Sequence, residues 1–256
     1  MNSDAVIEFR EVSYLLTDGR PILRNLNIEV YRGEILVLLG RSGSGKTTAL
    51  KLVNRLLKTQ RGELRVEGCP VSEWDVIELR RHIGYAIQEV GLFPHFTVER
   101  NIGLVPTIEN WPKEKIAQRV EELIKLVGLN GDVASRYPHQ LSGGQRQRVG
   151  VARALAADPP ILLMDEPFGA LDPLTRADLQ HEFLWLQKKL QKTVLFVTHD
   201  LREAMLLGSR IALLEEGSLV SLSSREEFLA SPDPLVKKYV EAFGTTLEYS
   251  GKRGNT

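Results

Sequence analysis

The sequence predicts an α/β protein with a mainly parallel sheet and a helical insertion. Short apolar runs of strand length alternate with segments of helical pattern along the 256-residue chain, which is the order that builds a parallel sheet. One such run, at 35–39, leads into a helix-like segment at 49–53 through a glycine-rich loop. The middle of the chain differs, because residues 113–127 place their apolar side chains on one helical face.

Local patterns predict the individual elements. Short strands are expected where apolar residues alternate or cluster, at 6–12, 26–30, 35–39, 63–66, 83–87, 161–164 and 194–197. A final hairpin is expected to pair 211–214 with 219–220. Helices are expected at 75–81, 113–127, 144–157 and 174–191. The last dozen residues are rich in Gly, Ser, Thr and Lys and are expected to be frayed.

Charge and composition exclude several classes of protein. Lys and Arg together number 33, as do Asp and Glu, so the formal net charge of zero argues against a nucleic-acid partner. No apolar run approaches the roughly 20 residues that cross a bilayer, and the N-terminus lacks the basic and apolar regions of a signal peptide. Cys69 is the only cysteine, which excludes an internal disulfide. We therefore expect a soluble cytoplasmic protein.

Residues 40–47 read Gly-Arg-Ser-Gly-Ser-Gly-Lys-Thr and form a complete phosphate-binding loop. Glycines let the backbone turn its N–H groups inward, and the helix N-terminus adds partial positive charge. Lys46 can reach the β- and γ-phosphates, while Thr47 can ligate Mg²⁺. A chance Gly/Ser-rich turn is the weaker interpretation, because a strand and a helix flank the motif. The nucleotide-binding residues expected here are Gly40, Ser42, Gly43, Ser44, Gly45, Lys46, Thr47 and Thr48.

Asp165 and Glu166 follow the apolar run at 161–164. Carboxylates at the C-terminal tip of a buried strand lie at the usual ligand edge of an α/β sheet. Asp165 suits a Mg²⁺ role, direct or through water, and Glu166 suits deprotonation of an attacking water. The alternative is a pair of acidic residues at a helix N-cap, which the phosphate-binding loop upstream makes weaker.

A second glycine pair precedes another predicted helix, in Leu141-Ser142-Gly143-Gly144-Gln145. Ser142 is a candidate N-cap, and the glycines expose backbone N–H groups at a helix start. The segment is either a second anion-binding surface or a simple capped helix entry. The residues alone do not say what it binds.

These motifs together resemble the ATP-binding-cassette (ABC) ATPases in order and spacing. The phosphate-binding loop is followed by Leu141–Gln145, which looks like the family's signature motif, then by Asp165-Glu166 and Thr198-His199-Asp200. Gln88 is similar to the family's Q-loop, and Ala170-Leu171-Asp172 to its D-loop. The resemblance covers about residues 6 to 230. A P-loop kinase or GTPase gives no reason for the signature-like pentapeptide.

The resemblance implies a P-loop NTPase (RecA-like) core with a mainly parallel sheet, an N-terminal antiparallel β region and a helical subdomain insertion. The implied boundaries assign the core to 1–88 and 151–222 and the helical signature subdomain to 89–150. Residues 223–256 are expected to form a C-terminal helix and a frayed tail.

The resemblance also implies a mechanism with ATP and Mg²⁺ as cofactors. Two subunits, identical or paralogous, are expected to pair head to tail, so that the loop at 40–47 of one and Ser142, Gly143, Gly144 and Gln145 of the other enclose one ATP. The implied catalytic residues are Lys46 on the phosphates, Glu166 as general base, Gln88, and His199 on the γ-phosphate. Thr47, Gln88 and Asp165 are the expected Mg²⁺ ligands. Asp172 is expected to act across the dimer interface.

The adenine platform departs from the family pattern. Members commonly place an aromatic residue about three positions after a Val-Ser pair. Val12 and Ser13 are present, but that position is Leu16 here. Tyr14 lies two residues earlier on the same side of a strand. It either substitutes as the adenine platform or is an ordinary strand tyrosine.

The longer motifs are similar to importer-type ATPases, and most closely to those that take up osmoprotectants such as glycine betaine, choline or proline. The stretches that carry this likeness are 83–85, 91–95, 101–106 and 167–176. Some such ATPases carry a C-terminal regulatory module, for which this chain is expected to be too short. The alternatives are the ATPase of another ABC transporter, for amino acids or phospholipid trafficking, and a soluble non-transport ABC ATPase.

An importer ATPase without membrane segments implies integral membrane permease subunits as partners and, indirectly, a substrate-binding protein. In the family the segment after the Q-loop touches the permease, so 88–98 is the expected contact. The implied location is peripheral, on the cytoplasmic face of the inner or plasma membrane. No nucleic-acid partner is expected.

Overall fold

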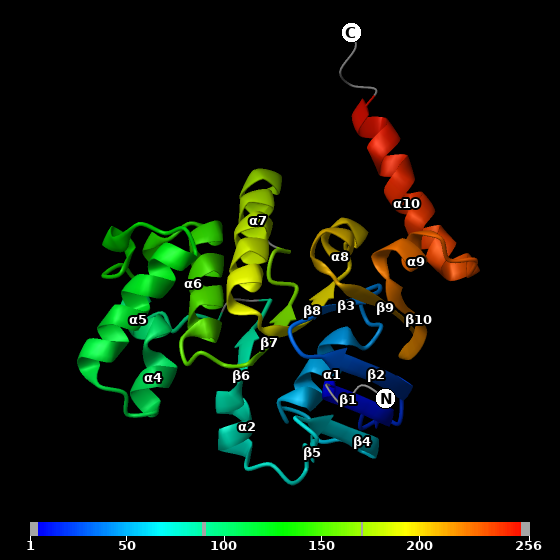
Figure 1. Ribbon diagram of the computed structural model, residues 1–256, viewed down its shortest axis with the longest axis horizontal. Coiled ribbons are helices and arrows are strands. Elements are labelled where there is room, and N and C mark those ends of the chain that lie inside the picture. The colour runs from blue at the N-terminus through cyan, green and yellow to red at the C-terminus, as the bar shows by residue number, and fades with distance from the viewer. Residues whose placement is uncertain (1–4, 89–90, 170, 252–256) are drawn as a thin grey trace. The chain divides into compact units, whose positions relative to one another are not determined.

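The computed structural model describes residues 5–88, 91–169 and 171–251, with side chains to residue 242. The chain forms two compact units, one from residues 1–73 with 196–256 and one from 74–195. Figure 1 follows the chain from the blue N-terminal strands to the red C-terminal helix. The two units are described separately.

The first unit contains an antiparallel sheet, in agreement with the predicted N-terminal β region. Its strands run in the order β2-β1-β4-β5, with the bounds β1 Ala5–Leu15, β2 Pro21–Tyr31, β4 Arg61–Val66 and β5 Cys69–Pro70. Ile7 opposes Val30 on one side and Val66 on the other, and all three side chains are buried. In the second half of β2 and in β4, buried side chains alternate with exposed or half-buried ones, which places one face of the sheet in the core.

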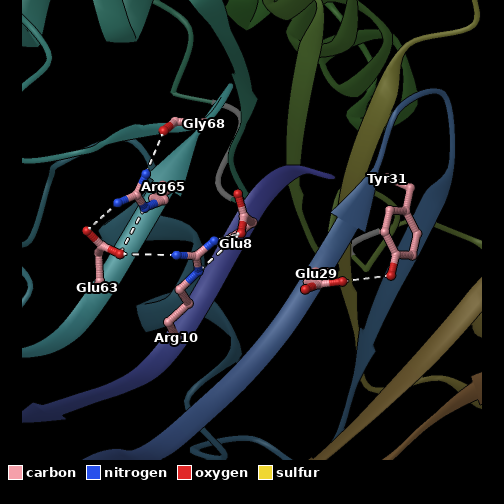
Figure 2. A network of polar contacts seen from close by, with 7 residues as sticks. All are labelled: Glu8, Arg10, Glu29, Tyr31, Glu63, Arg65 and Gly68. Atoms are coloured by element: carbon pink, nitrogen blue, oxygen red, sulfur yellow. Dashed lines mark hydrogen bonds and ion pairs between the residues drawn. The ribbon is translucent and has the colours of Figure 1, made fainter. Parts of the chain in front are cut away.

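The other face of this sheet carries paired charges (Figure 2). Arg10 on β1 bonds Glu8 of its own strand and lies 3.5 Å from Glu63, the residue opposite it on β4. Arg65 donates two hydrogen bonds to Glu63 and one to the carbonyl of Gly68. The bond from Arg65 holds the pKa of Glu63 below its usual value. Such exposed pairs add little stability individually, and they mark this face as solvated.

In the residues that the structure describes, the same unit holds three further strands and four helices. Buried strand β3 (Ile35–Leu39) pairs in parallel with β9 (Arg210–Glu215), and β10 (Ser218–Ser224) returns antiparallel to β9, which confirms the predicted final hairpin. The helices are α1 Lys46–Val53, α8 Leu201–Leu207, α9 Arg225–Leu229 and α10 Pro234–Gly251. Strand β8 (Thr193–Thr198) begins in the second unit and ends in the first.

The second unit combines two parallel strands with most of the helices. β6 (Ile83–Ala86) pairs with β7 (Ile161–Asp165), and both are largely buried. The helices are α2 Val76–His82, α3 Val98–Ile102, α4 Leu104–Ile108, α5 Lys113–Leu126, α6 Gly143–Leu155 and α7 Pro173–Leu190, with 3-10 turns at Gly131–Val133 and Pro138–Gln140. α5 buries Val120, Leu123 and Ile124, as its sequence pattern predicts.

The C-terminal prediction was partly wrong. Residues 245–251, expected to be frayed, continue helix α10. Residues 252–256, Glu89, Val90 and Ala170 lie outside the described residues, so part of the expected D-loop and permease-contact segment is not described. The subdomain boundaries at 88/89, 150/151 and 222/223 remain predictions. Among the described residues, no helix combines the length and apolar character that a bilayer-spanning segment requires.

Candidate nucleotide-binding site

The phosphate-binding loop joins β3 to α1, as the sequence predicts. Gly45 is the N-cap of α1 and has φ +98°. A Cβ at this position would lie 2.7 Å from the carbonyl oxygen of Ile22 and 2.6 Å from a methyl group of Leu23, so only glycine fits. Because glycine brings no side-chain acceptor to the helix N-terminus, this end of α1 suits an anionic ligand.

Lys46 lies along the loop rather than out in solvent. Its side chain is buried, and its ammonium donates hydrogen bonds of 2.8 Å to the carbonyls of Gly40 and Arg41. The hydroxyl oxygen of Ser44 is also buried and has no hydrogen-bond partner among the described residues. A buried hydroxyl without a partner is costly. A cation and a buried hydroxyl without a partner in one loop fit the oxygens of a phosphate chain.

His199 lies at the end of β8 in the same unit. Its exposed side chain lines a cavity of about 490 Å³ together with Arg41 of the phosphate-binding loop. The other walls come from the start of α8, the end of β9 and the first turns of α10. The fold therefore brings the predicted γ-phosphate contact and the loop to one cavity.

Asp165 ends strand β7 in the second unit and is buried. The hydroxyl of Tyr85, on neighbouring strand β6, donates to its carboxylate at 3.4 Å. Burial first, and then the charge of Asp165, raises the pKa of Tyr85, so the phenol stays protonated and remains a donor. The N-cap alternative for Asp165 and Glu166 is wrong, because the next helix, α7, is capped by Asp172.

Glu166 has an unusual backbone. Its φ of +44° lies in the left-handed region, which a glutamate adopts at an energetic cost. Its half-buried carboxylate accepts a hydrogen bond of 3.3 Å from the side-chain amide of Gln88. The structure thus brings the predicted general base and the Q-loop residue into direct contact. Strained backbone of this kind concentrates at functional sites.

The signature-like segment begins α6. The hydroxyl of Ser142 accepts from the backbone N–H of Gln145 at 3.2 Å, and the Gln145 side chain accepts from the N–H of Ser142 at 3.0 Å. A Cβ on Gly144 would lie 2.6 Å from a methyl group of Thr175, so glycine lets α6 approach α7 closely. The capped helix entry is confirmed, and binding of an anion there remains a prediction.

The predicted D-loop residue lies beside this segment. Asp172 caps α7 by accepting a 3.1 Å hydrogen bond from the N–H of Thr175, the residue that Gly144 approaches. Hydrogen bonds from Thr175, the side chain first, hold the pKa of Asp172 below its usual value. Asp172 is therefore an anion that stabilises the start of α7.

The predicted Mg²⁺ ligands comprise a hydroxyl, an amide and one carboxylate. This donor set of oxygens is the kind that Mg²⁺ prefers, with water and phosphate oxygens filling the other positions. In the described part of the chain, no three His, Cys, Asp or Glu side chains gather as a metal site. The assignment of Thr47, Gln88 and Asp165 as Mg²⁺ ligands remains a prediction.

Comparison with known proteins identifies the family. The family profile described as ABC transporter matches residues 23–169, more than half of the chain. The chain belongs to the ABC transporter family. The glycine betaine/carnitine/choline transport ATP-binding protein OpuCA of Bacillus subtilis (strain 168) is 47% identical over 93% of this chain and 62% of its own length.

Other relatives of this ABC protein have similar names. The glycine betaine uptake system ATP-binding protein YehX of Escherichia coli (strain K12) is 48% identical over 89% of this chain and 73% of its own length. The choline transport ATP-binding protein OpuBA of Bacillus subtilis (strain 168) is 46% identical, over 92% and 62%. The chain spans about three-fifths of the length of the first such relatives.

Solved structures confirm the P-loop NTPase fold of this ABC protein. The dimeric post-hydrolysis state of the ATP-binding cassette MJ0796, bound to ADP and Pi, has a TM-score of 0.77 and 33% identity. The match covers 86% of this chain and 98% of that one. The structure of cbiO1 from Clostridium perfringens has a TM-score of 0.83 and 26% identity, with 96% and 100% covered.

The position of Tyr14 fits both an adenine platform and an ordinary strand tyrosine. The residue lies on β1 opposite Leu23, the residue that approaches Gly45 at the phosphate-binding loop, and its side chain is half-buried. Leu16 follows the end of β1, where its N–H bonds the carbonyl of Arg20 in a turn. Tyr14 is thus near the loop along the sheet, and its role as adenine platform remains a prediction.

Sequence reasoning missed three residues that contact or lie beside the predicted site residues. Arg41 shares the cavity of His199, Tyr85 donates to Asp165, and Glu203 contacts Thr198 beside His199. Glu203 could have been found from the sequence, because it is an acidic residue in the first turn of the helix that follows Thr198-His199-Asp200. Tyr85 gave no local signal, because its partner comes from a strand 80 residues away.

Proposed function

We propose that this ABC protein binds and hydrolyses ATP as the motor subunit of an importer. The observation that carries the proposal is the phosphate-binding loop, where Lys46 is buried and the buried Ser44 hydroxyl has no hydrogen-bond partner among the described residues, a combination that suits phosphate oxygens. Thr47, Gln88 and Asp165 would hold Mg²⁺, which neutralises phosphate charge. The names of relatives 44–50% identical over most of the chain support an ATP-binding role.

Two residues of the chain are assigned to the attacking water. Glu166 accepts the proton of this water. Its Oε2 already accepts a hydrogen bond from Gln88, so Oε1 is the oxygen assigned to the proton. His199 donates to the γ-phosphate and holds the water in line with it. Lys46 neutralises the β- and γ-phosphates in ground state and transition state.

Dimerisation completes the site in this proposal. Two copies, or this chain and a paralogue, pair head to tail, so that residues 142–145 of one subunit meet the γ-phosphate bound to the other. Asp172 acts at that interface. A unit-charge contact at about 4 Å is worth on the order of 4 kcal/mol at an effective dielectric near 20, so a few contacts can decide between open and closed pairs. The dimeric cassettes among the structural neighbours support this arrangement.

The permease contact is assigned to a groove in the second unit. Its volume is about 380 Å³, and its lining includes Gly91 and Phe93, which lie in the segment expected to touch the permease. Arg80, Arg81 and Arg153 contribute its charge, and the carbonyl of Gly91 accepts a 2.8 Å hydrogen bond from Arg153. Burial lowers the pKa of Arg153. Apolar walls with cations suit a short permease helix that carries an acidic residue.

The solute is assigned from the relatives. Those compared carry glycine betaine, choline, carnitine or osmoprotectant in their names, so we propose a quaternary-amine osmoprotectant such as glycine betaine. A substrate-binding protein would deliver it, and this chain would act peripherally at the cytoplasmic face of the membrane. The ATPase of an amino-acid or lipid-trafficking transporter is the alternative.

Reconstitution tests this function. The protein is co-purified with its permease, placed in proteoliposomes with a substrate-binding protein, and supplied with ATP inside. We expect uptake of labelled glycine betaine or choline that is lost in Lys46→Ala, while the exposed Lys51→Ala on the same helix transports normally. ATP turnover that drives amino acids instead would favour the alternative. No ATP turnover by the assembled complex would refute the proposal.

A further inference from the structure

A chain of hydrogen bonds encloses the backbone at His199. The hydroxyl of Thr198 donates to the carboxylate of Glu203 at 2.5 Å and accepts from the backbone N–H of Asp200 at 3.0 Å. The side chains of Thr198 and Glu203 are buried, at 1% and 5% exposure, whereas His199 is exposed. One hydroxyl therefore ties together the residues on both sides of the histidine. We name Thr198, Asp200 and Glu203 the clasp.

The direction of each bond in the clasp follows from donor and acceptor chemistry. A hydroxyl has one hydrogen and two lone pairs, and an ionised carboxylate only accepts. Because Thr198 gives its hydrogen to Glu203, a lone pair is left to receive the N–H of Asp200. A hydrogen bond between a hydroxyl and a carboxylate is short and strong. Glu203 thus orients the hydroxyl, and the hydroxyl orients the peptide after His199.

The clasp also closes the turn from β8 into α8. The carboxylate of Asp200 accepts a 2.8 Å hydrogen bond from the N–H of Arg202 and starts the helix. Glu203 lies in the first turn of that helix, and its side chain reaches back to the last residue of β8. His199 is the exposed residue between these anchors. Its direction into the cavity shared with Arg41 therefore depends on the clasped backbone.

We propose that Glu203 is a positioning residue for His199, acting through Thr198. This inference rests on the proposed ATP hydrolysis. Glu203 does not touch the nucleotide; it holds the histidine where the γ-phosphate and the attacking water are expected. A shift of about 1 Å in such a group can cost up to about 10²-fold in rate. Loss of the clasp should therefore lower kcat more than it changes the KM for ATP.

The kinetic test uses the assembled transporter. We expect Glu203→Ala and Thr198→Val each to lower kcat for ATP by roughly tenfold or more, with KM within about twofold. Thr198→Ser keeps the hydroxyl and Glu203→Gln keeps an acceptor oxygen, so both should retain most of the rate. A large change in KM with unchanged kcat would overturn the proposal.

A double variant distinguishes loss of His199 positioning from a general loss of enzyme activity. If Glu203 acts through His199, Glu203→Ala should cause no further loss of kcat in a His199→Ala protein. A further fall of the same size would show that Glu203 acts elsewhere. The matched control is Glu34→Ala, which removes another partly buried, hydrogen-bonded carboxylate. Glu34 precedes the N-terminal end of β3, whereas the phosphate-binding loop follows the C-terminal end of that strand. Glu34→Ala should leave kcat of the folded protein unchanged.

Hydrogen exchange gives a readout that does not need ATP turnover. The backbone amide of Asp200 should exchange faster in Glu203→Ala and in Thr198→Val, and at the wild-type rate in Glu34→Ala. Unchanged protection of Asp200 in both clasp variants would overturn the clasp, whatever the transporter does. If the wild-type complex does not hydrolyse ATP, the proposed function fails, and the exchange experiment still decides whether the clasp orders this turn.

Discussion

Two helix starts in this protein look alike in sequence and differ in construction. Both the phosphate-binding loop before α1 and the signature segment before α6 are rich in Gly and Ser. At α1 the N-cap is Gly45, without a side-chain cap, and the buried Lys46 lies against the loop. At α6 the side chains of Ser142 and Gln145 each accept a hydrogen bond from the backbone N–H of the other residue, so these two donors are already paired within the chain.

This difference assigns different tasks to the two helix starts. The loop before α1 leaves a buried hydroxyl at Ser44 unsatisfied and supplies a cation, so it should bind phosphate without help. The segment before α6 is already capped, so a phosphate there gains less. We therefore expect the first site to bind ATP in the monomer and the second to contribute only in a dimer.

The largest effect should come from the cation. Lys46→Ala removes the positive charge and one charge-assisted hydrogen bond that the ammonium can still donate to phosphate, worth up to about 3 kcal/mol, so ATP affinity should fall by up to about 100-fold. Calorimetric titration of the monomer measures it, with Lys51→Ala as the control. Near-normal affinity in Lys46→Ala would place the principal phosphate contact elsewhere and break the comparison.

The next effect separates binding from chemistry. Glu166→Gln removes the proton acceptor but keeps an oxygen, so hydrolysis should slow by ~10²-fold or more while ATP still binds. Because ATP then persists, the variant should form dimers with Mg-ATP, which sedimentation velocity measures. A variant that turns ATP over at the wild-type rate would remove Glu166 from the role of general base.

The first helix start was predictable from sequence and the second only in part. The loop at 40–47 is read from contiguous residues, so strand, loop and helix were all predicted correctly. Ser142 was recognised as a cap, and the Ser-x-x-Gln spacing that makes Gln145 its reciprocal partner was also available. The close approach of Gly144 to Thr175 could not be predicted, because Thr175 is 31 positions further along the chain.

Other features depend on contacts that no local pattern encodes. The left-handed backbone of Glu166 runs against the preference of its residue type, so only the folded site reveals it. The helical course of residues 245–251 was missed because their composition favours disorder. Helix α10 is anchored earlier, at the fully buried Val236, and a helix that has begun propagates at little cost.

A smaller effect tests the cap at α6. Ser142→Ala removes the acceptor for the N–H of Gln145, which should lower the free energy of unfolding by about 1 kcal/mol. ATP binding to the monomer should not change, whereas ATP-dependent dimerisation should weaken. Chemical denaturation and sedimentation velocity give the two readouts. Weaker ATP binding by the monomer would show that the two helix starts are not separate in function.

The smallest effect concerns pH. The pKa of Asp172 is lowered in the folded protein by hydrogen bonds from Thr175, so its contribution to stability is present above its unfolded pKa of about 3.9. That contribution is lost as pH falls through the lower folded value, because the protonated carboxyl caps α7 less well. Asp172→Asn keeps a capping oxygen without the charge, so it should reduce the stability difference between pH 6 and pH 3. Denaturation curves at both pH values measure this. Asp75→Asn, the same substitution at the N-cap of α2, is measured beside it for comparison. An unchanged pH dependence would mean that Asp172 is held by neutral contacts alone, and that the α7 start beside Gly144 carries no anionic cap.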